Sequence, residues 1–259
     1  MTEEPFFVPA DDSTYRPNPI CRGPWDPSSL NGRVVAGLIG CVAEARHGGE
    51  GWIPARMTVD MYRLPGFDPV TVETRVIREG RRIKVIDAEF VSAGKSQARG
   101  VFQFLKLGEN SPGDVWMPEP WDAPGPEAVP PPEDTRHRMW AMRPISGAMG
   151  TSGPRRTWMK EVREMVAGTP VSPFARVAAA CDFASPFANS GSDGLGYINT
   201  DITLSLHRLP RSEWLGFESH YHGADAGVAV GQCRLYDEEG AIGLATCLAL
   251  AQMMPQRPR

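Results

Sequence analysis

The chain has 259 residues, 41% of them hydrophobic and 22% charged, and a formal net charge of −4. This length suits one large domain or two of ordinary size, and this composition is typical of a globular protein rather than a disordered one. The mildly acidic charge argues against a general affinity for nucleic acid or anionic membranes, since both need a basic surface.

The N-terminus and the cysteines indicate a cytoplasmic protein. The sequence MTEEPFF is acidic and has no long apolar run, so it does not resemble a signal peptide. No stretch approaches the roughly 20 apolar residues of a membrane helix. The cysteines match no zinc or CxxC spacing, and we expect reduced core thiols and neither a metal nor a cofactor. They are Cys21, Cys41, Cys181, Cys233 and Cys247.

The first predicted helix begins at about Ser28 or Ser29, where a serine can cap it, and ends at Ala45, shortly before two glycines. Its apolar residues recur every four positions from Leu30, and small residues fill the other faces. The helix is therefore expected to be buried on nearly all sides. Alternating apolar and polar residues then predict four antiparallel strands, at 55–64, 71–80, 82–93 and 97–106.

A proline-rich stretch lies near the middle of the chain, where many of the 25 prolines fall between Ser111 and Pro132. Proline lacks an amide hydrogen and fixes φ, so this stretch can be neither a helix interior nor a central strand. We interpret it as an extended linker. The predicted domains are therefore residues 1–108 and 136–259, with the linker at 109–135.

The second half repeats the order of the first. A helix capped by Ser172 is predicted from Pro173 to Phe183 or slightly beyond, because serine is a favourable cap and proline a favourable first residue. This helix is also apolar and rich in small residues. The strands predicted after it are residues 198–209, 214–223, 227–238 and 241–251.

Two short matches at nearly equal offsets support an internal repeat. RVVA at residues 33–36 resembles RVAA at 176–179, and RLP at 63–65 recurs at 208–210. A helix buried on all sides can be covered by a strongly curved antiparallel sheet, and two such units can join their sheets edge to edge. The predicted fold is therefore α+β, a double hotdog with two curved antiparallel sheets, each wrapped round a central apolar helix.

Short motifs in both halves resemble the type II acyl-CoA thioesterases of the double-hotdog superfamily. They are the helix start Leu30–Val35, the segment Ala179–Phe183, the stretch His207–Trp214 and the strand end Leu244–Thr246. The resemblance covers almost the whole chain outside the linker. It implies the double-hotdog fold, an acyl-CoA or other acyl thioester as substrate, and a homodimer.

The resemblance also implies catalytic positions. The family activates a water molecule with an aspartate, a threonine or serine, and a glutamine. The aspartate corresponds to Asp182, and the hydroxyl residue corresponds to Asn199, with Thr200 next to it. The glutamine corresponds to Leu248, or to Cys247 if the register shifts by one, so this amide is missing.

Asp182 interrupts an otherwise apolar helix, where an unpaired carboxylate is costly, and the repeat places Ile39 at the matching position of the first half. The functional interpretation is a general base whose pKa is raised in a partly dry site. Backbone amides around Asn31 and Gly32, at the start of the first helix, are expected to face the thioester oxygen. The alternative is a structural carboxylate that bonds backbone amides or an arginine.

Other interpretations stay open. The missing glutamine favours a catalytically weak or inactive acyl-CoA or lipid-binding protein. A dehydratase would pair an aspartate with a histidine, but only His47 lies near a predicted helix, at the wrong end. His220 and His222 share a strand face without a third metal ligand, so we expect them to face solvent. A CoA tail is expected to meet surface cations such as Arg155 and Arg156.

Overall fold

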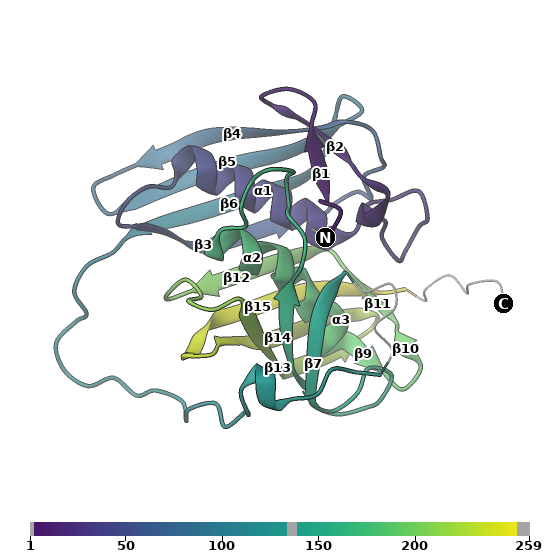
Figure 1. Ribbon diagram of the computed structural model, residues 1–259, viewed down its shortest axis with the longest axis vertical. Helices are drawn as coiled ribbons and strands as arrows, with labels where there is room; N and C mark the ends of the chain where they lie inside the picture. Colours follow the sequence, from purple (N-terminus) through teal and green to yellow (C-terminus); the bar gives the residue numbers. More distant parts are fainter. Residues whose placement is uncertain (1–2, 134–138, 253–259) are drawn as a thin grey trace.

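The computed structural model describes residues 3–133 and 139–252, and it shows two halves that each combine helix and antiparallel strands (Figure 1). In the first half the long helix α1 contacts β3, β4, β5 and β6. The elements of this half are β1 (Phe7–Pro9), β2 (Thr14–Pro17), η1 (Pro19–Cys21), α1 (Gly32–His47), β3 (Trp52–Asp60), β4 (Val70–Glu79), β5 (Ile83–Ser92) and β6 (Lys95–Lys106). None of the described helices is long and apolar enough to cross a bilayer.

Helix α1 begins later than the predicted start at Ser28 or Ser29. These serines bond Asp26 instead: Ser28 Oγ donates to its carboxylate at 2.7 Å, and Ser29 Oγ donates to its carbonyl oxygen at 2.9 Å. Asn31 is the N-cap, and its side-chain oxygen accepts the Arg33 amide at 3.0 Å. The predicted cap was wrong because a serine can bond a neighbouring turn as readily as a helix end.

In the second half, Ser172 caps α2 as predicted, accepting the Ala175 amide at 2.9 Å, and Pro173 is the first helical residue. The helix continues through a tight turn and a further helix, past the predicted end near Phe183. The elements of this half are η2 (Pro126–Ala128), β7 (Trp140–Ser146), β8 (Arg156–Glu161), α2 (Pro173–Ala180), η3 (Cys181–Phe183), α3 (Ala184–Asn189), β9 (Ser190–Gly191), β10 (Gly194–Leu195), β11 (Tyr197–Asn199), β12 (Asp201–Leu206), β13 (Trp214–Asp225), β14 (Val228–Asp237) and β15 (Gly240–Ala251).

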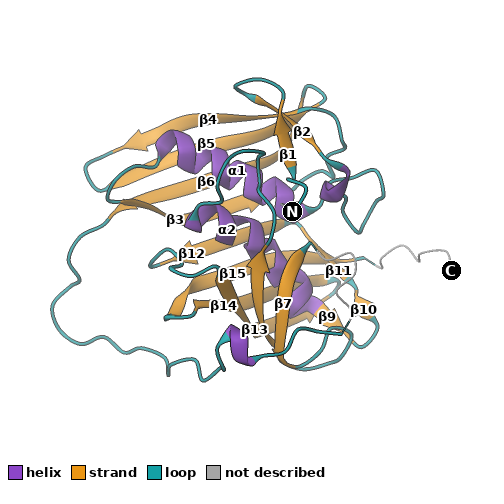
Figure 2. Ribbon diagram, in the orientation of Figure 1, coloured by secondary structure: helices purple, strands orange, loops and turns teal. Residues whose placement is uncertain are grey.

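Where the sequence predicted two sheets, thirteen of the described strands form one continuous sheet. Strand β3 of the first half pairs with β12 of the second in antiparallel register. Thr58 lies opposite Thr203 in this ladder, and their hydroxyl oxygens are 3.1 Å apart. The halves are thus joined edge to edge, which removes two exposed strand edges. Figure 2 shows the strands in orange and the helices, in purple, lying against them.

Helices α1 and α2 pack against each other in antiparallel directions through small residues. A Cβ atom added at Gly37 would lie 3.0 Å from Ala179 Cβ, and one added at Gly40 would lie 2.7 Å from Ala178 Cβ. The missing side chains therefore allow the two backbones to approach closely. This packing brings the start of α1 to the end of α2.

The proline-rich stretch has no helix or strand between β6 and η2, and it is exposed as far as Pro120. From Trp121 onward it packs on the second half. The Trp121 ring stacks on Tyr236 at 4.2 Å between centroids and meets Trp158 edge-on at 4.9 Å. Only the first part of the stretch is thus an exposed connection. The domain boundary at 108 stays a prediction, and the boundary between 135 and 136 lies outside the described residues.

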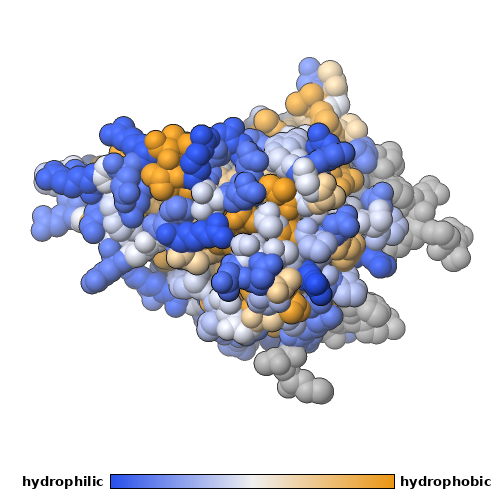
Figure 3. Space-filling model, turned by 90° about the horizontal axis from the view of Figure 1, so that it is seen from above, coloured by the Kyte–Doolittle hydropathy of each residue, from blue (hydrophilic) through white to orange (hydrophobic). Residues whose placement is uncertain are grey.

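The outer surface of the first half is mainly hydrophilic. Seen from above, hydrophobic clusters lie separately among polar side chains (Figure 3). The first part of strand β4 follows this pattern, because Val70 and Val72 are buried whereas Glu73, which points to the other face, is exposed. The apolar core therefore lies on the inner side, where the sheet meets the helices.

Replacing Gly40 with leucine is expected to lower the free energy of unfolding by about 1–3 kcal/mol, because the new side chain overpacks the contact with α2. Chemical denaturation followed by circular dichroism measures this change. Gly108→Leu is the matched control, since a Cβ at Gly108 meets nothing within 4 Å. Equal stability of the two variants would contradict the close helix contact.

Candidate active site

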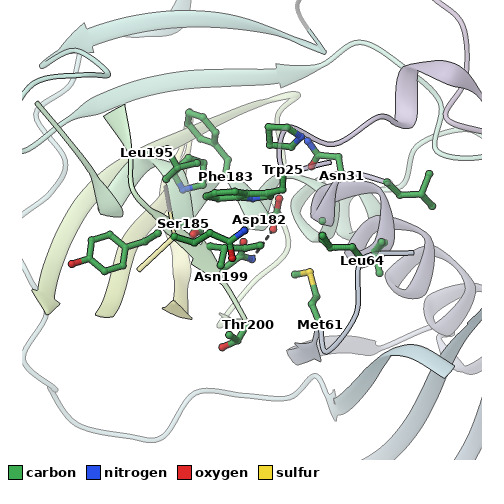
Figure 4. A pocket seen from close by; sticks show the side chains of 18 of the residues that line it. Trp25, Asn31, Met61, Leu64, Asp182, Phe183, Ser185, Leu195, Asn199 and Thr200 are labelled. Atoms are coloured by element: carbon green, nitrogen blue, oxygen red, sulfur yellow. Dashed lines mark hydrogen bonds between the residues drawn. The ribbon is translucent and has the colours of Figure 1, made fainter. Parts of the chain in front are cut away.

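A pocket of about 530 Å³ lies between the two halves, where α1 begins and α2 ends. Its walls come from the loop before α1, the segment after β3, strand β7 and the stretch from η3 to β11. The structure brings all five predicted site residues to this pocket: Asn31, Gly32, Asp182, Asn199 and Thr200. Figure 4 shows the side chains of Asn31, Asp182, Asn199 and Thr200.

Asp182 lies in η3, between α2 and α3, and its half-buried side chain lines the pocket. Its Oδ1 accepts a hydrogen bond from Asn199 Nδ2 at 3.0 Å, the bond drawn as a dashed line in Figure 4. The backbone amide of Arg33 lies near enough to lower the pKa of this carboxylate, although the hydrogen bond that it donates goes to Asn31. In the described part of the chain, Asn199 is the only side chain that bonds it, so the carboxylate is open to the pocket.

Burial raises the pKa of Asp182 above its ordinary value. The hydrogen bond from Asn199, the positive charge of Arg33 and the Arg33 amide each act in the opposite direction. The effect of burial is the larger, so this carboxylate binds a proton more tightly than an exposed aspartate does. A carboxylate of this kind is suited to accept a proton from a bound molecule.

The start of α1 approaches Asp182 closely because Gly32 has no side chain. A Cβ atom on Gly32 would lie 2.7 Å from Asp182 Oδ1 and 3.1 Å from Met61 Sδ. The Asn31 amide donates to the Cys21 carbonyl oxygen at 2.7 Å, whereas the Gly32 amide has no acceptor among the described residues. Of the two predicted amides, that of Gly32 is therefore the one available to a ligand, at the positive end of the helix dipole.

The next residue of α1 is a buried arginine that connects the halves. The Arg33 guanidinium pairs with Glu161, at the end of β8, and both side chains are buried. Its Cζ lies 4.1 Å from the centre of the Trp140 ring and 5.0 Å from that of Phe6. Because breaking a buried ion pair is strongly destabilising, this contact holds the first turn of α1 against the second half.

Thr200 lines the pocket, but it lies apart from the carboxylate. Its Oγ1 is 3.5 Å from the Leu248 carbonyl oxygen, and Figure 4 shows it away from the Asp182 side chain. Sequence reasoning missed Ser185, a buried residue that also lines the pocket. Its spacing of three residues from Asp182 could have revealed it, because such residues share a helix face.

The position of the missing glutamine lies on β15. Leu248 is 49% exposed on the outer face, whereas Cys247 is buried and accepts a hydrogen bond from Asn189 of α3. Since strand residues alternate between faces, only Cys247 of this pair points toward the helices. Neither residue is an amide, and the side-chain amide beside Asp182 comes from Asn199 on β11.

The expected contact of a CoA tail with Arg155 and Arg156 is not supported. Arg155 is buried rather than on the surface. Its guanidinium donates to the main-chain oxygens of Ala148, Thr151, Phe187 and Ser190. Arg156 pairs with Asp122 and Glu218. Both arginines therefore already serve the packing of the second half.

The histidines and cysteines form no reactive cluster in the part of the chain that the structure describes. His220 and His222 are exposed, and His222 Nδ1 lies 2.8 Å from Asn189 Oδ1. No three described side chains gather as metal ligands. The five cysteines are free, and all but Cys41 are buried.

Comparison with known protein families matches most of the chain. Residues 21–105 match the N-terminal domain of acyl-CoA thioesterases, and residues 115–251 match their C-terminal domain. No curated protein sequence is significantly similar to the chain. The two matched domains correspond to the two halves of the structure.

Solved structures of low sequence identity share the fold. A proposed thioesterase from Novosphingobium aromaticivorans has a TM-score of 0.73 at 21% identity, with 97% of this chain and 100% of that one covered. A hotdog-fold protein from Alicyclobacillus acidocaldarius and an acyl-CoA thioesterase II from Mycobacterium marinum have TM-scores of 0.74 and 0.67, each at 15% identity with 96% of both chains covered. The predicted hotdog fold is thus confirmed.

Removal of the Asn199 amide is expected to raise the pKa of Asp182 further. In Asn199→Ala the carboxylate loses a hydrogen bond that favours its charged form. Carbon-13 NMR titration of the Asp182 carboxyl group measures this shift. Thr200→Ala should leave the pKa unchanged, because Thr200 does not bond the carboxylate. A pKa that stays constant or falls in Asn199→Ala would contradict the observed geometry.

Proposed function

The chain belongs to the acyl-CoA thioesterase family, and on this premise we propose that it hydrolyses acyl thioesters with a water molecule activated by Asp182. One observation supports this proposal above others: a carboxylate of raised pKa faces a pocket at the free start of a helix. Thioester hydrolysis needs these two parts, a base for the water and a donor for the oxyanion.

In the proposed reaction Asp182 removes a proton from water while the water oxygen bonds to the thioester carbonyl carbon. The carbonyl oxygen becomes negative, and the Gly32 amide at the positive end of α1 stabilises this charge. The carbonyl then re-forms as the C–S bond breaks. The proton held by Asp182 passes to the leaving thiolate, so the products are a carboxylic acid and a thiol.

We propose that other residues of the site position the two reacting groups, the Asp182 carboxylate and the Gly32 amide. Asn199 orients the Asp182 carboxylate through the bond to Oδ1. Asn31 fixes the first turn of α1 by capping it, which aims the Gly32 amide. Thr200 lines the pocket but lies apart from the carboxylate, so it is given no part in holding the water.

The walls of the pocket suit an acyl group. Apolar side chains from both halves line it beside the carboxylate: Trp25, Leu64, Phe183 and Leu195. Such walls favour a hydrocarbon chain and keep bulk water from the base. The volume of about 530 Å³ also lies in the range usual for small-molecule sites.

The second candidate is an acyl-CoA or lipid-binding protein with weak or no hydrolysis. It is favoured by the absence of an amide at both Cys247 and Leu248. Calorimetry and a thiol-release assay on the same acyl-CoA separate the two. Binding without release of CoA would favour this candidate, and absence of binding would exclude both.

A homodimer and a cytoplasmic location stay predictions. The outer face of the second half carries exposed apolar side chains on neighbouring strands, and Val228 lies opposite Leu250 there. Such a surface suits a second copy of the chain. The free cysteines are consistent with a reducing compartment.

Asp182→Asn is expected to lower kcat for acyl-CoA hydrolysis by about 100-fold or more, because the amide cannot accept the proton. The same change should stabilise the fold at neutral pH. Since burial raises the pKa of Asp182, its folded-state pKa exceeds the unfolded one, and ionisation costs stability as pH rises through the folded value. Thermal unfolding at pH 7 tests this second effect. Hydrolysis by Asp182→Asn at the wild-type rate would refute the role of Asp182 as the general base.

Gly32→Ala is expected to lower kcat by about 10–100-fold, because the new methyl group displaces the carboxylate from the start of α1. Steady-state kinetics and thermal unfolding test this change. Gly108→Ala is the matched control, since its Cβ meets nothing. Unchanged kcat in Gly32→Ala would show that hydrolysis does not need the close approach of the Asp182 carboxylate to the start of α1.

A further inference from the structure

We propose that the Ser185 hydroxyl holds the attacking water together with Asp182. This inference rests on the proposed function and adds a positioning residue that the resemblance does not supply. The resemblance places a hydroxyl on the strand at Asn199, where this chain has an amide. Ser185 supplies a hydroxyl from the helix instead.

Ser185 lies on the same face of the helical segment as Asp182. The turn η3 leads directly into α3, and residues three apart in such turns lie one above the other. Both residues line the pocket. Figure 4 shows Ser185 next to the bonded pair of Asp182 and Asn199.

The hydrogen bonding of Ser185 leaves room for a water molecule. Ser190 donates to the Pro186 carbonyl oxygen at 2.6 Å, as a serine near a helix usually does. Within the described residues, the Ser185 hydroxyl bonds no main-chain oxygen, and its neighbour is the Cys247 thiol. Sulfur is a weak partner, whereas buried hydroxyls normally have a strong one. A water molecule in the pocket can be this strong hydrogen-bond partner for Ser185.

The two residues together can orient a water molecule fully. Asp182 accepts one hydrogen of the water, and Ser185 Oγ accepts the other. The Ser185 hydrogen is proposed to point at the Cys247 sulfur, a neighbour whose pKa the hydroxyl lowers although burial raises it to about 11. One lone pair of the water is then free to attack the carbonyl carbon.

The test compares Ser185→Ala with wild type. We expect kcat to fall by about 10–100-fold because the water loses one of its two supports. KM should stay within about twofold, since the hydroxyl does not bind the acyl chain. The pH at which kcat falls to half its maximum on the acid side should also be unchanged, because burial and Asn199 determine the pKa of Asp182. Ser190→Ala is the matched control: it removes a buried hydroxyl outside this pocket, and kcat should not change.

Three outcomes would overturn the inference. If Ser185→Ala keeps the wild-type kcat while Asp182→Asn is inactive, Ser185 does not hold the water and the proposed function stands. If Ser185→Ala unfolds, or loses thermal stability and raises KM, its role is structural. If the wild-type chain releases no thiol from any acyl-CoA, the proposed function fails and the inference fails with it.

Discussion

The site depends on the contact between the Asp182 carboxylate and the first turn of α1. Two features permit it. Gly32 has no side chain to block the approach, and Asn31 caps the helix start, where the Gly32 amide has no acceptor among the described residues. The buried pair of Arg33 and Glu161 then fixes this turn against the opposite half. The proposed base, Asp182, and the proposed oxyanion donor, the Gly32 amide, come from different halves, so neither half contains the whole candidate site.

The two central helices meet at both ends, but the ends differ chemically. At one end Asp182 faces the start of α1 beside the pocket. At the other end the Glu44 carboxylate of α1 faces the start of α2 and accepts a hydrogen bond from Ser172, the α2 cap. Burial raises the pKa of Glu44, and this bond lowers it. In this repeated architecture one carboxylate, Asp182, thus lines the pocket, whereas the other, Glu44, contacts the start of a helix.

Local sequence patterns allowed much of the fold to be predicted, whereas contacts between residues distant in the sequence could not be predicted. Ser172 before a proline marked a helix start correctly, and Asp182 stood out in an apolar helix. Ser29 led to a wrong prediction of the helix start. Its hydroxyl bonds the turn at Asp26, and in a sequence such a serine looks the same as one that caps a helix. The sequence indicated Gly32 through its amide, but its close approach to Asp182 involves a residue of the other half and is visible only in the structure. The spacing of Ser185 from Asp182 was a usable signal, but only the structure shows that both residues line one pocket.

The peptide that joins the halves contributes little to holding them together. Residues 107–120 are exposed throughout, while the ladder between β3 and β12, the helix packing and the pair of Arg33 with Glu161 connect the halves directly. Such a tether acts mainly by raising the local concentration of one half near the other. Nicking it with a protease would leave a noncovalent heterodimer, and the gene could be divided there into two co-expressed fragments.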